Sequence, residues 1–468
     1  MTYINIYTLI LVSSIHMQIL YFYKKIMQTD NIFYLLLVSI FLIFYSLRLT
    51  TLIIYPNSIM SQFKIENFGY EEINDFLIYM NLIFLIAHLV FLKFSTSFVV
   101  KIPSINYNHM INIIFYLSVF ALFCSIFYNF YYLQVTDFGQ NQNRLLSYLS
   151  ILFNYQFPLI ILFITFIMKI SIKKSFVIVF TLIFFVLFIS LIGSRSALVT
   201  VVMLFGFSLL VVHRNFQLKL SLSRAVLFGI IVFLMYVTFN LGTYAREQFF
   251  SIKIPFSLKN MSLITIKYIN YNFLYQDIEE DIEIQQGGYI GNRTSLIYSR
   301  VGFLDIASFS YNYEGIQDVY NGHNYFKSII DNLLTPGFNV YDQLPTARMF
   351  RMKYQNVDLE NIKQYYHTDM ITIFSELKIL FGYLGIFIVP FILYTFLLIK
   401  QKIESGNLLE FTKYYWLVIL YLLYFNFINS FGFDTFCINT AKSVIISLIY
   451  FLIIKLITKL MKVSICQQ

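Results

Sequence analysis

Three side chains able to carry acid–base chemistry stand where a long polar stretch of the chain meets an apolar one. His367 and Asp369 come directly before the apolar segment 371–399, and Glu376 lies one to two helical turns inside it. At a membrane edge, a histidine or a carboxylate can act as the general base for a hydroxyl near a lipid headgroup. His367, Asp369 and Glu376 are therefore candidate catalytic residues. The alternative is that the histidine only anchors its helix at the interface.

The arginines are the candidate anion ligands. Arginine carries a permanent charge on a planar fork of donors, which suits bidentate binding of phosphate or carboxylate. Of the ten arginines, eight lie in the polar stretch 244–370 or toward the same side of the membrane: Arg48, Arg144, Arg195, Arg246, Arg293, Arg300, Arg348 and Arg351. We expect Arg195, Arg300, Arg348, Arg351 and His323 to bind substrate. The alternative is that the arginines of the stretch pair with its 14 acidic residues on a solvated surface.

Arg195 is the sharpest single case. It lies in the sequence Leu-Ile-Gly-Ser-Arg-Ser-Ala-Leu, residues 191–198, between two apolar segments with almost no connection. A charge there is costly unless it faces a polar cavity, and Gly193 and the flanking serines allow the backbone to turn. The alternative is an interfacial arginine that extends to water. Arg48 is a similar case, several residues inside its segment.

These residues must be positioned by membrane helices. The chain is 59% hydrophobic with a mean hydropathy of +0.71, which excludes a soluble enzyme. A helix that spans about 30 Å of hydrocarbon needs about 20 apolar residues. We predict an all-α bundle of about eleven spans, or twelve: Tyr3–Tyr23, Ile32–Tyr55, Phe76–Phe94, Met110–Leu133, Leu145–Met168, Ser175–Ile192, Ala197–Val212, Ala225–Gly242, Ile371–Ile399, Tyr414–Ser430 and Ala441–Leu460.

Lysine and arginine in the connections predict the orientation. One set of connections carries 16 of these residues, whereas the short connections on the other side carry Lys64, Arg144 and Arg195. The C-terminus is therefore expected in the cytoplasm and the long polar stretch outside it. This divides the chain into spans one to eight (1–243), a periplasmic loop of short helices (244–370), and spans nine to eleven with a cytoplasmic tail (371–468).

Composition and local sequence also indicate how the loop folds and which ligands are expected. The tract 322–337 predicts a turn, an amphipathic helix and a Pro-Gly stop, and the acidic run 277–283 is interpreted as a solvated face. Three cysteines, Cys124, Cys437 (in a predicted outer turn) and Cys466, form no CxxC pair. We expect no metal, no cofactor and no nucleic acid. The net charge of +9 follows from membrane topology, since the loop has 11 basic and 14 acidic residues.

Three motifs together resemble the O-antigen (oligosaccharide repeat-unit) polymerases of the Wzy type. They are the Gly-Ser-Arg-Ser-Ala-Leu turn at 193–198, the Gly-His-x-Tyr tract at 322–325 leading to Pro336-Gly337, and the segment Phe-Ser-Glu-Leu-Lys-Ile-Leu-Phe-Gly-Tyr-Leu-Gly at 374–385. The overall plan of many spans and one late periplasmic loop is similar too. Lys378 departs from the pattern, which has an aromatic or apolar residue there.

The resemblance implies metal-independent glycosyl transfer in the bacterial inner membrane. Donor and acceptor would be glycans linked to undecaprenyl pyrophosphate, and a chain-length regulator is a further expected partner. Arginines would stabilise the departing pyrophosphate, and His367 or a neighbouring carboxylate would serve as the base.

Functions of other classes stay open. A flippase or other transporter of lipid-linked oligosaccharides would favour charges deep in many spans, and here the span interiors are nearly free of charge. Another polyprenyl-linked glycosyltransferase or a ligase would need an acidic pair in the first outer loop. The run Glu71-Glu72-x-x-Asp75 offers one, although we expect it to cap the third span. Nothing in the sequence favours a structural or sensory protein.

Overall fold

The chain folds into helices. The computed structural model describes residues 5–27, 32–54, 70–94, 108–135, 152–169, 171–191, 195–212, 257–270, 323–334, 343–355, 372–406, 410–430 and 432–466, with a few isolated positions between them. These residues contain no strand. Lipid offers the backbone no hydrogen-bond partner, so each apolar segment satisfies its own N–H and C=O groups by forming a helix. The predicted all-α class is confirmed.

Among the residues that the structure describes, seven helical segments are long and apolar enough to cross a membrane. In chain order the elements are α1 (Ile6–Met27), α2 (Ile32–Ile40), the π-helical turn η1 (Phe41–Ser46), α3 (Leu47–Ile54), α4 (Tyr70–Phe94), α5 (Asn108–Val135), α7 (Gln156–Met168), α8 (Ile172–Leu191), α9 (Arg195–Val212), α11 (Leu258–Ile269), α15 (Tyr325–Leu334), α16 (Thr346–Gln355), α18 (Ile373–Phe381), the 3-10 turn η4 (Gly382–Leu384), α19 (Gly385–Ser405), α20 (Glu410–Ile428) and α21 (Phe433–Cys466).

The helices overlap the predicted segments, although α4 begins at Tyr70, before the predicted Phe76, and α7 begins at Gln156, after the predicted Leu145. Two further differences affect the site. The first is that α21 begins at Phe433, eight residues before the predicted start at Ala441, so Cys437 lies in a helix and not in an outer turn. Polar residues in its first two turns lower the hydropathy there, and protein contacts compensate for them. The second is that the predicted ninth span is interrupted at Gly382, which has φ 56°. The predicted span 225–242 lies almost wholly outside the described residues, and the number of spans stays a prediction.

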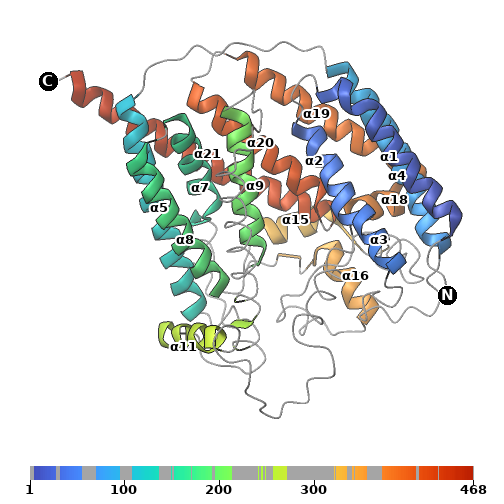
Figure 1. Ribbon diagram of the computed structural model, residues 1–468, viewed down its shortest axis with the longest axis horizontal. Helices are drawn as coiled ribbons and strands as arrows, with labels where there is room; N and C mark the ends of the chain where they lie inside the picture. The colour runs from blue at the N-terminus through green and yellow to red at the C-terminus, as the bar shows by residue number, and fades with distance from the viewer. Residues whose placement is uncertain are drawn as a thin grey trace.

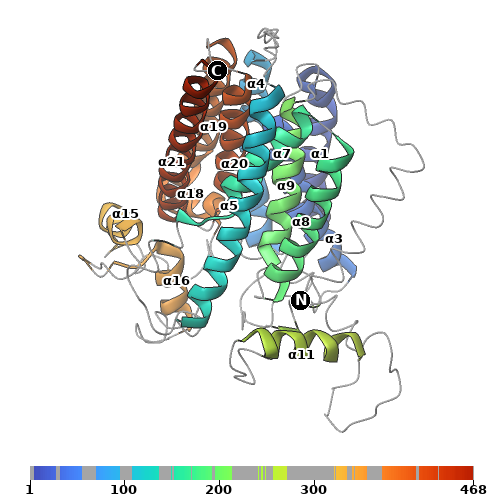
Figure 2. The ribbon, with the colours of Figure 1, turned by 90° about the vertical axis from the view of Figure 1, so that its left-hand side faces the viewer.

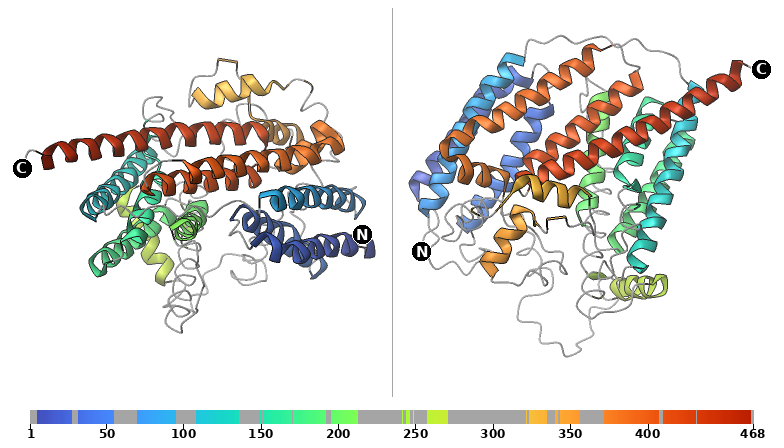
Figure 3. Two further views of the ribbon diagram at one scale, coloured as in Figure 1. Left: turned by 90° about the horizontal axis from the view of Figure 1, so that it is seen from above. Right: turned by 180° about the vertical axis from the view of Figure 1, so that it is seen from behind.

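The bundle consists of two groups of helices joined by the C-terminal helices. On one side α1, α2 and α4 lie together, and on the other α5, α7, α8 and α9 (Figures 1 and 3). Helix α20 packs against α2 of the first group and against α7 and α9 of the second (Figure 3). Its Tyr421 contacts the rings of Phe33 on α2 and Phe207 on α9. Helix α20 is therefore the centre of the core.

A stripe of polar side chains joins α4 to α1 and α2. Asn74, Asn81 and His88 recur every seven residues along α4, on one face of the helix. Thr8 donates to Asn74 Oδ1 at 2.6 Å, Asn81 Nδ2 donates to the Leu11 carbonyl at 3.0 Å, and the Tyr34 hydroxyl lies 3.1 Å from His88 Nε2. Hydrogen bonds between membrane helices fix their register because apolar packing alone does not.

Short helices from the predicted loop lie at one end of the bundle. Helices α11 and α16 lie at the end where α1 begins, and α21 ends at the other (Figures 1 and 2). Helix α15 packs against α21, and so does α16. The loop thus contributes helices directly to the membrane bundle. Which end faces the cytoplasm stays a prediction.

Candidate functional site

A buried carboxylate marks the place where the loop helices meet the bundle. Glu376 is 0% exposed in the first turn of α18. The Tyr325 hydroxyl on α15 donates to Glu376 Oε1 at 2.7 Å, and the Phe433 backbone N–H on α21 donates to Oε2. One side chain thus joins three helices.

The start of α18 fixes the position of this carboxylate. Thr372 and Ser375 form a reciprocal cap, in which the Thr372 hydroxyl accepts from the Ser375 N–H and Ser375 Oγ accepts from the Thr372 N–H. The Ile373 N–H donates to the Ser430 carbonyl at 3.0 Å, which ties this cap to the end of α20. Such a cap stabilises a helix start by about 1 kcal/mol. Glu376 is therefore held on a rigid element.

A second carboxylate, Asp434 in the first turn of α21, is also 0% exposed. Its Oδ2 accepts from Ser328 Oγ at 2.9 Å and from the Thr346 N–H at 2.8 Å. His323 Nε2 lies 3.3 Å from the same oxygen. Buried charge is tolerated only when it is paired and hydrogen-bonded, and here α15, α16 and the residues before them supply the donors.

His323 is oriented from both of its ring nitrogens. Gln343 Nε2 lies 3.2 Å from Nδ1, and Thr346 Oγ1 lies 3.0 Å from Nε2. With the Gln343 amide donating to Nδ1, the ring proton is on Nε2 and points toward Asp434. The ring packs edge-on against Tyr325 with centroids 4.7 Å apart.

Tyr325 connects the two carboxylates. Burial and then the negative charge of Glu376 raise the pKa of Tyr325 above its usual range. The phenol therefore stays neutral and remains a donor to Glu376. The Tyr325 residue is partly exposed, unlike the two carboxylates.

Gly432 separates the two carboxylates. Its φ is 117°, a conformation that other residues rarely adopt. A Cβ placed on Gly432 would lie 3.2 Å from Glu376 Oε2 and 3.4 Å from Asp434 Oδ1. Glycine is therefore required here for both conformation and space.

Two positive side chains lie where the loop helix α16 packs against the span α21. Arg348 is in the first turn of α16, and Lys442 lies within the apolar segment 433–456 of α21. The two charges are close enough to repel each other. A charged residue inside a span is usually functional, so Lys442 and Arg348 are candidate ligands for an anion where α16 packs against α21.

A separate ion pair lies on the opposite side of α18. Lys378 is 0% exposed at its side chain, and its ammonium contacts the carboxylate of Asp75, which is 34% exposed, on α4. The Tyr383 hydroxyl donates to Asp75 Oδ1 at 2.6 Å. The lysine that departs from the family pattern thus has a structural partner. The acids Glu71 and Glu72 lie in the first turn of α4, as predicted for a cap.

The structure brings together three of the predicted site residues: Glu376, His323 and Arg348. Arg195 begins α9 and Arg351 lies on α16, but their side chains are outside the described part of the chain, as are the residues Arg300, His367 and Asp369. Arg48 is buried on α3, 1% exposed. Among the described residues no group of three or more His, Cys, Asp or Glu side chains could hold a metal ion.

Sequence reasoning missed Tyr325 as a site residue, together with Asp434 and Lys442. Asp434 and Lys442 lie in the first turns of α21, whose polar residues lower the hydropathy there. For this reason the start of that helix was predicted too late, and Asp434 was assigned to a connection. For Tyr325 the only signal was the Gly-His-x-Tyr tract.

The fold and this site define an all-helical, multi-pass membrane protein with a buried polar cluster at one end of its bundle. No protein family, curated protein or solved structure matches the chain.

Proposed function

We propose that this chain is a glycosyltransferase of the bacterial inner membrane that joins oligosaccharide repeat units into a surface polysaccharide. Both substrates are glycans linked to undecaprenyl pyrophosphate, and the reaction takes place at the periplasmic face without a metal ion. The observation that carries the proposal is a polar cluster around the start of α21. Glu376 of α18 and Tyr325 of α15 meet there, and Arg348 and Lys442 lie where α16 packs against α21.

The arrangement of α16 and α21 suits a lipid-linked substrate in which a diphosphate connects the sugar to the lipid. Thr346 of α16 contacts Asp434 of α21, and two residues further along α16 Arg348 lies near Lys442. Asp434 and Lys442 are eight residues apart, which corresponds to about 12 Å along the helix axis. Lys442 therefore lies further along α21 than Asp434, as the diphosphate lies closer to the lipid than the sugar.

In the proposed reaction, the acceptor hydroxyl oxygen forms a bond to the anomeric carbon of the donor. The bond from that carbon to the diphosphate oxygen breaks, and its electron pair stays on the diphosphate. Arg348 and Lys442 stabilise the developing charge, a role that fixed cations perform best in a water-poor site. Arg195, Arg300 and Arg351 are further candidates for this role.

The proton of the acceptor hydroxyl passes to the Tyr325 oxygen as the Tyr325 proton passes to Glu376. Glu376 accepts the Tyr325 proton over an existing hydrogen bond of 2.7 Å, within reach for general base catalysis. Asp434 and His323 hold α15 and α16 in place. His367 and Asp369 remain alternative bases from the sequence.

Deletion of the gene tests the function. Cells without the protein should display single repeat units on their surface glycolipid, and the ladder of long chains on a gel should disappear. Loss of the single unit as well would contradict the proposal and favour a flippase, whose absence traps repeat units on the cytoplasmic face.

Complementation tests the site. Glu376→Gln and Arg348→Ala should fail to restore the ladder while the protein accumulates normally in the membrane. Lys327→Gln is the matched control, because this lysine is exposed on α15 and lies over the Tyr341 ring. A normal ladder from Glu376→Gln would exclude Glu376 as the base.

A further inference from the structure

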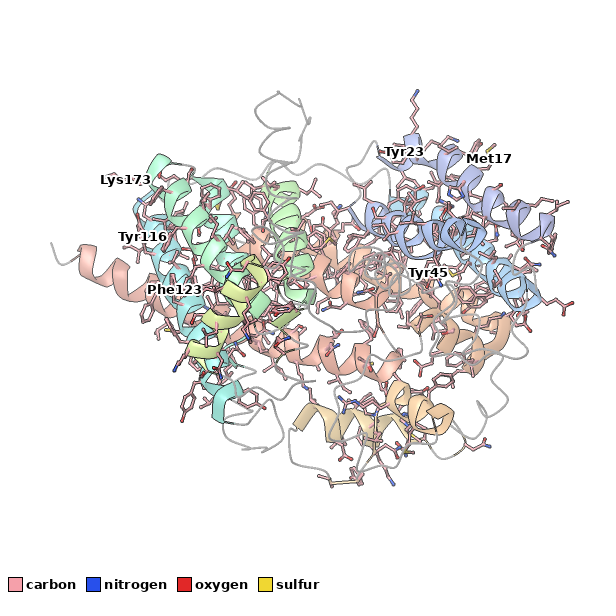
Figure 4. The ribbon with its side chains drawn as sticks, turned by 60° about the horizontal axis from the view of Figure 1, so that its bottom comes forward. Met17, Tyr23, Tyr45, Tyr116, Phe123 and Lys173 are labelled. Carbon is pink, nitrogen blue, oxygen red and sulfur yellow. The ribbon has the colours of Figure 1, made fainter. Side chains whose placement is uncertain are left out.

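A second cationic site lies at the other end of the bundle, where α7 connects to α8. Three lysines gather there: Lys169 at the end of α7, and Lys173 and Lys174 in the first turn of α8. Figure 4 shows Lys173 on α8 and Tyr116 on the adjacent α5. This end lies away from α11 and α16 (Figure 1), and the lysine distribution predicts that it faces the cytoplasm.

Lys174 is the unusual member of this group. Its residue is 3% exposed, and its ammonium has no hydrogen-bond partner among the described residues. The ammonium lies 5.0 Å from the centroid of the Phe115 ring on α5. Contact with a ring compensates only part of the loss of water from a buried charge. Lys174 therefore lacks an anionic partner in the described part of the protein.

The groups next to Lys174 add positive charge to the site and do not neutralise it. The charge of Lys169 is close enough to repel that of Lys174. Ser171 Oγ accepts from the Lys174 N–H at 3.3 Å and so begins the 20-residue helix α8, whose N-terminal end adds a partial positive charge. Helix N-termini and lysines together bind phosphate groups.

Apolar side chains next to the lysines indicate the source of the phosphate. Phe176 and Phe180 on α8 are 77% and 62% exposed, and Tyr116 and Phe120 on α5 are 51% and 67% exposed. In a membrane-spanning bundle such faces contact acyl chains. A phospholipid whose chains lie on these rings carries its headgroup to the level of the first turn of α8, whereas a free phosphate gains nothing from them.

We propose that the α7–α8 junction binds the phosphate group of an anionic phospholipid, with Lys174 as its principal ligand and Lys169 as the second. The four-carbon side chain of Lys174 turns its ammonium from the Phe115 ring toward the headgroup when lipid binds. The site is separate from the proposed glycosyltransferase site and does not depend on that function.

Native mass spectrometry of the purified full-length protein tests this. The protein is titrated with phosphatidylglycerol, with phosphatidylcholine and with inorganic phosphate. A lysine near an anionic lipid surface contributes about 1 kcal/mol, or about fivefold in affinity. Lys174→Gln should therefore weaken phosphatidylglycerol binding at least about fivefold and leave phosphatidylcholine binding unchanged. Lys173→Gln is the matched control, since it removes the same charge from an exposed neighbour, and it should have a smaller effect.

Two further arms keep the test decisive. Lys169→Gln should also weaken phosphatidylglycerol binding more than Lys173→Gln does, which decides the question if Lys174→Gln does not fold. Equal losses in the variants of Lys169, Lys173 and Lys174 would show general attraction by surface charge and overturn the site. Inorganic phosphate that binds as tightly as phosphatidylglycerol, with the same dependence on Lys174, would overturn the assignment to a lipid.

Discussion

The hydrogen bond from Tyr325 to Glu376 is the contact whose removal tests the site most directly. Tyr325→Phe keeps the ring and its packing against His323 and removes only the hydroxyl that donates to Oε1 at 2.7 Å. Glu376 is 0% exposed, so water does not replace this donor. A hydrogen bond to a charged group contributes about 1.5–3 kcal/mol, which is about 10- to 150-fold in an equilibrium constant.

The test measures both the unfolding temperature of the protein and the amount of long-chain polymer in cells. The purified Tyr325→Phe protein should unfold at a lower temperature than the wild type, and cells carrying it should make at least about tenfold less long-chain polymer. Tyr341→Phe is the control, because this tyrosine is on the same loop with 47% of its surface exposed. An unchanged unfolding temperature together with a normal ladder would refute the role of the Tyr325 hydroxyl.

A double-mutant cycle separates this contact from general damage. If the two side chains act as a pair, the free-energy losses of Tyr325→Phe and Glu376→Gln should fall short of additivity by about 1 kcal/mol or more in the double variant. Losses that add to within about 0.5 kcal/mol would show that the two residues act independently.

Three other predictions test the surroundings of the site. Gly432→Ala should lower the free energy of unfolding by about 1–3 kcal/mol because of the positive φ at this position, which thermal unfolding would measure. The same change should abolish polymer on a gel, since the new Cβ presses on Glu376. Asp75→Ala should lower the unfolding temperature more than Lys378→Met, because it removes the carboxylate next to a fully buried cation, whereas the second change leaves a carboxylate that is 34% exposed. Arg195→Lys should reduce polymer nearly as much as Arg195→Ala if this arginine grips a diphosphate with both arms of its fork, and a normal ladder from the lysine variant would contradict that role.

The sequence predicts the helices well because lipid makes hydropathy a direct signal. The predicted segment 76–94 and the helix α4 end at the same residue, Phe94. The start of α21 is predicted poorly for the opposite reason. Asp434 and Lys442 make that region look like a connection, although Ser328, Thr346 and His323 provide partners for the carboxylate of Asp434.

The site is predictable only in part, because its contacts join residues far apart in the chain. Glu376 and His323 stand out by residue type and position. Nothing local shows that Asp434 accepts from Ser328, which is 106 residues away in the sequence. Lys378 looks like a departure from the family pattern until α4 brings Asp75, 303 residues distant, to its ammonium.

Glu376 and Lys378 together explain why α18 is a short, separate helix. Two residues apart on α18, they face opposite sides, Glu376 toward α15 and α21 and Lys378 toward α4. Gly385, at the start of α19, allows close packing, because a Cβ there would lie 2.7 Å from the Leu377 carbonyl oxygen. A continuous helix through Gly382 would follow the packing of α19 against α4 and would leave the carboxylate no freedom to meet α15. The break therefore lets α18 take its orientation from its two polar contacts, which is the condition for a loop helix and a span to share one buried carboxylate.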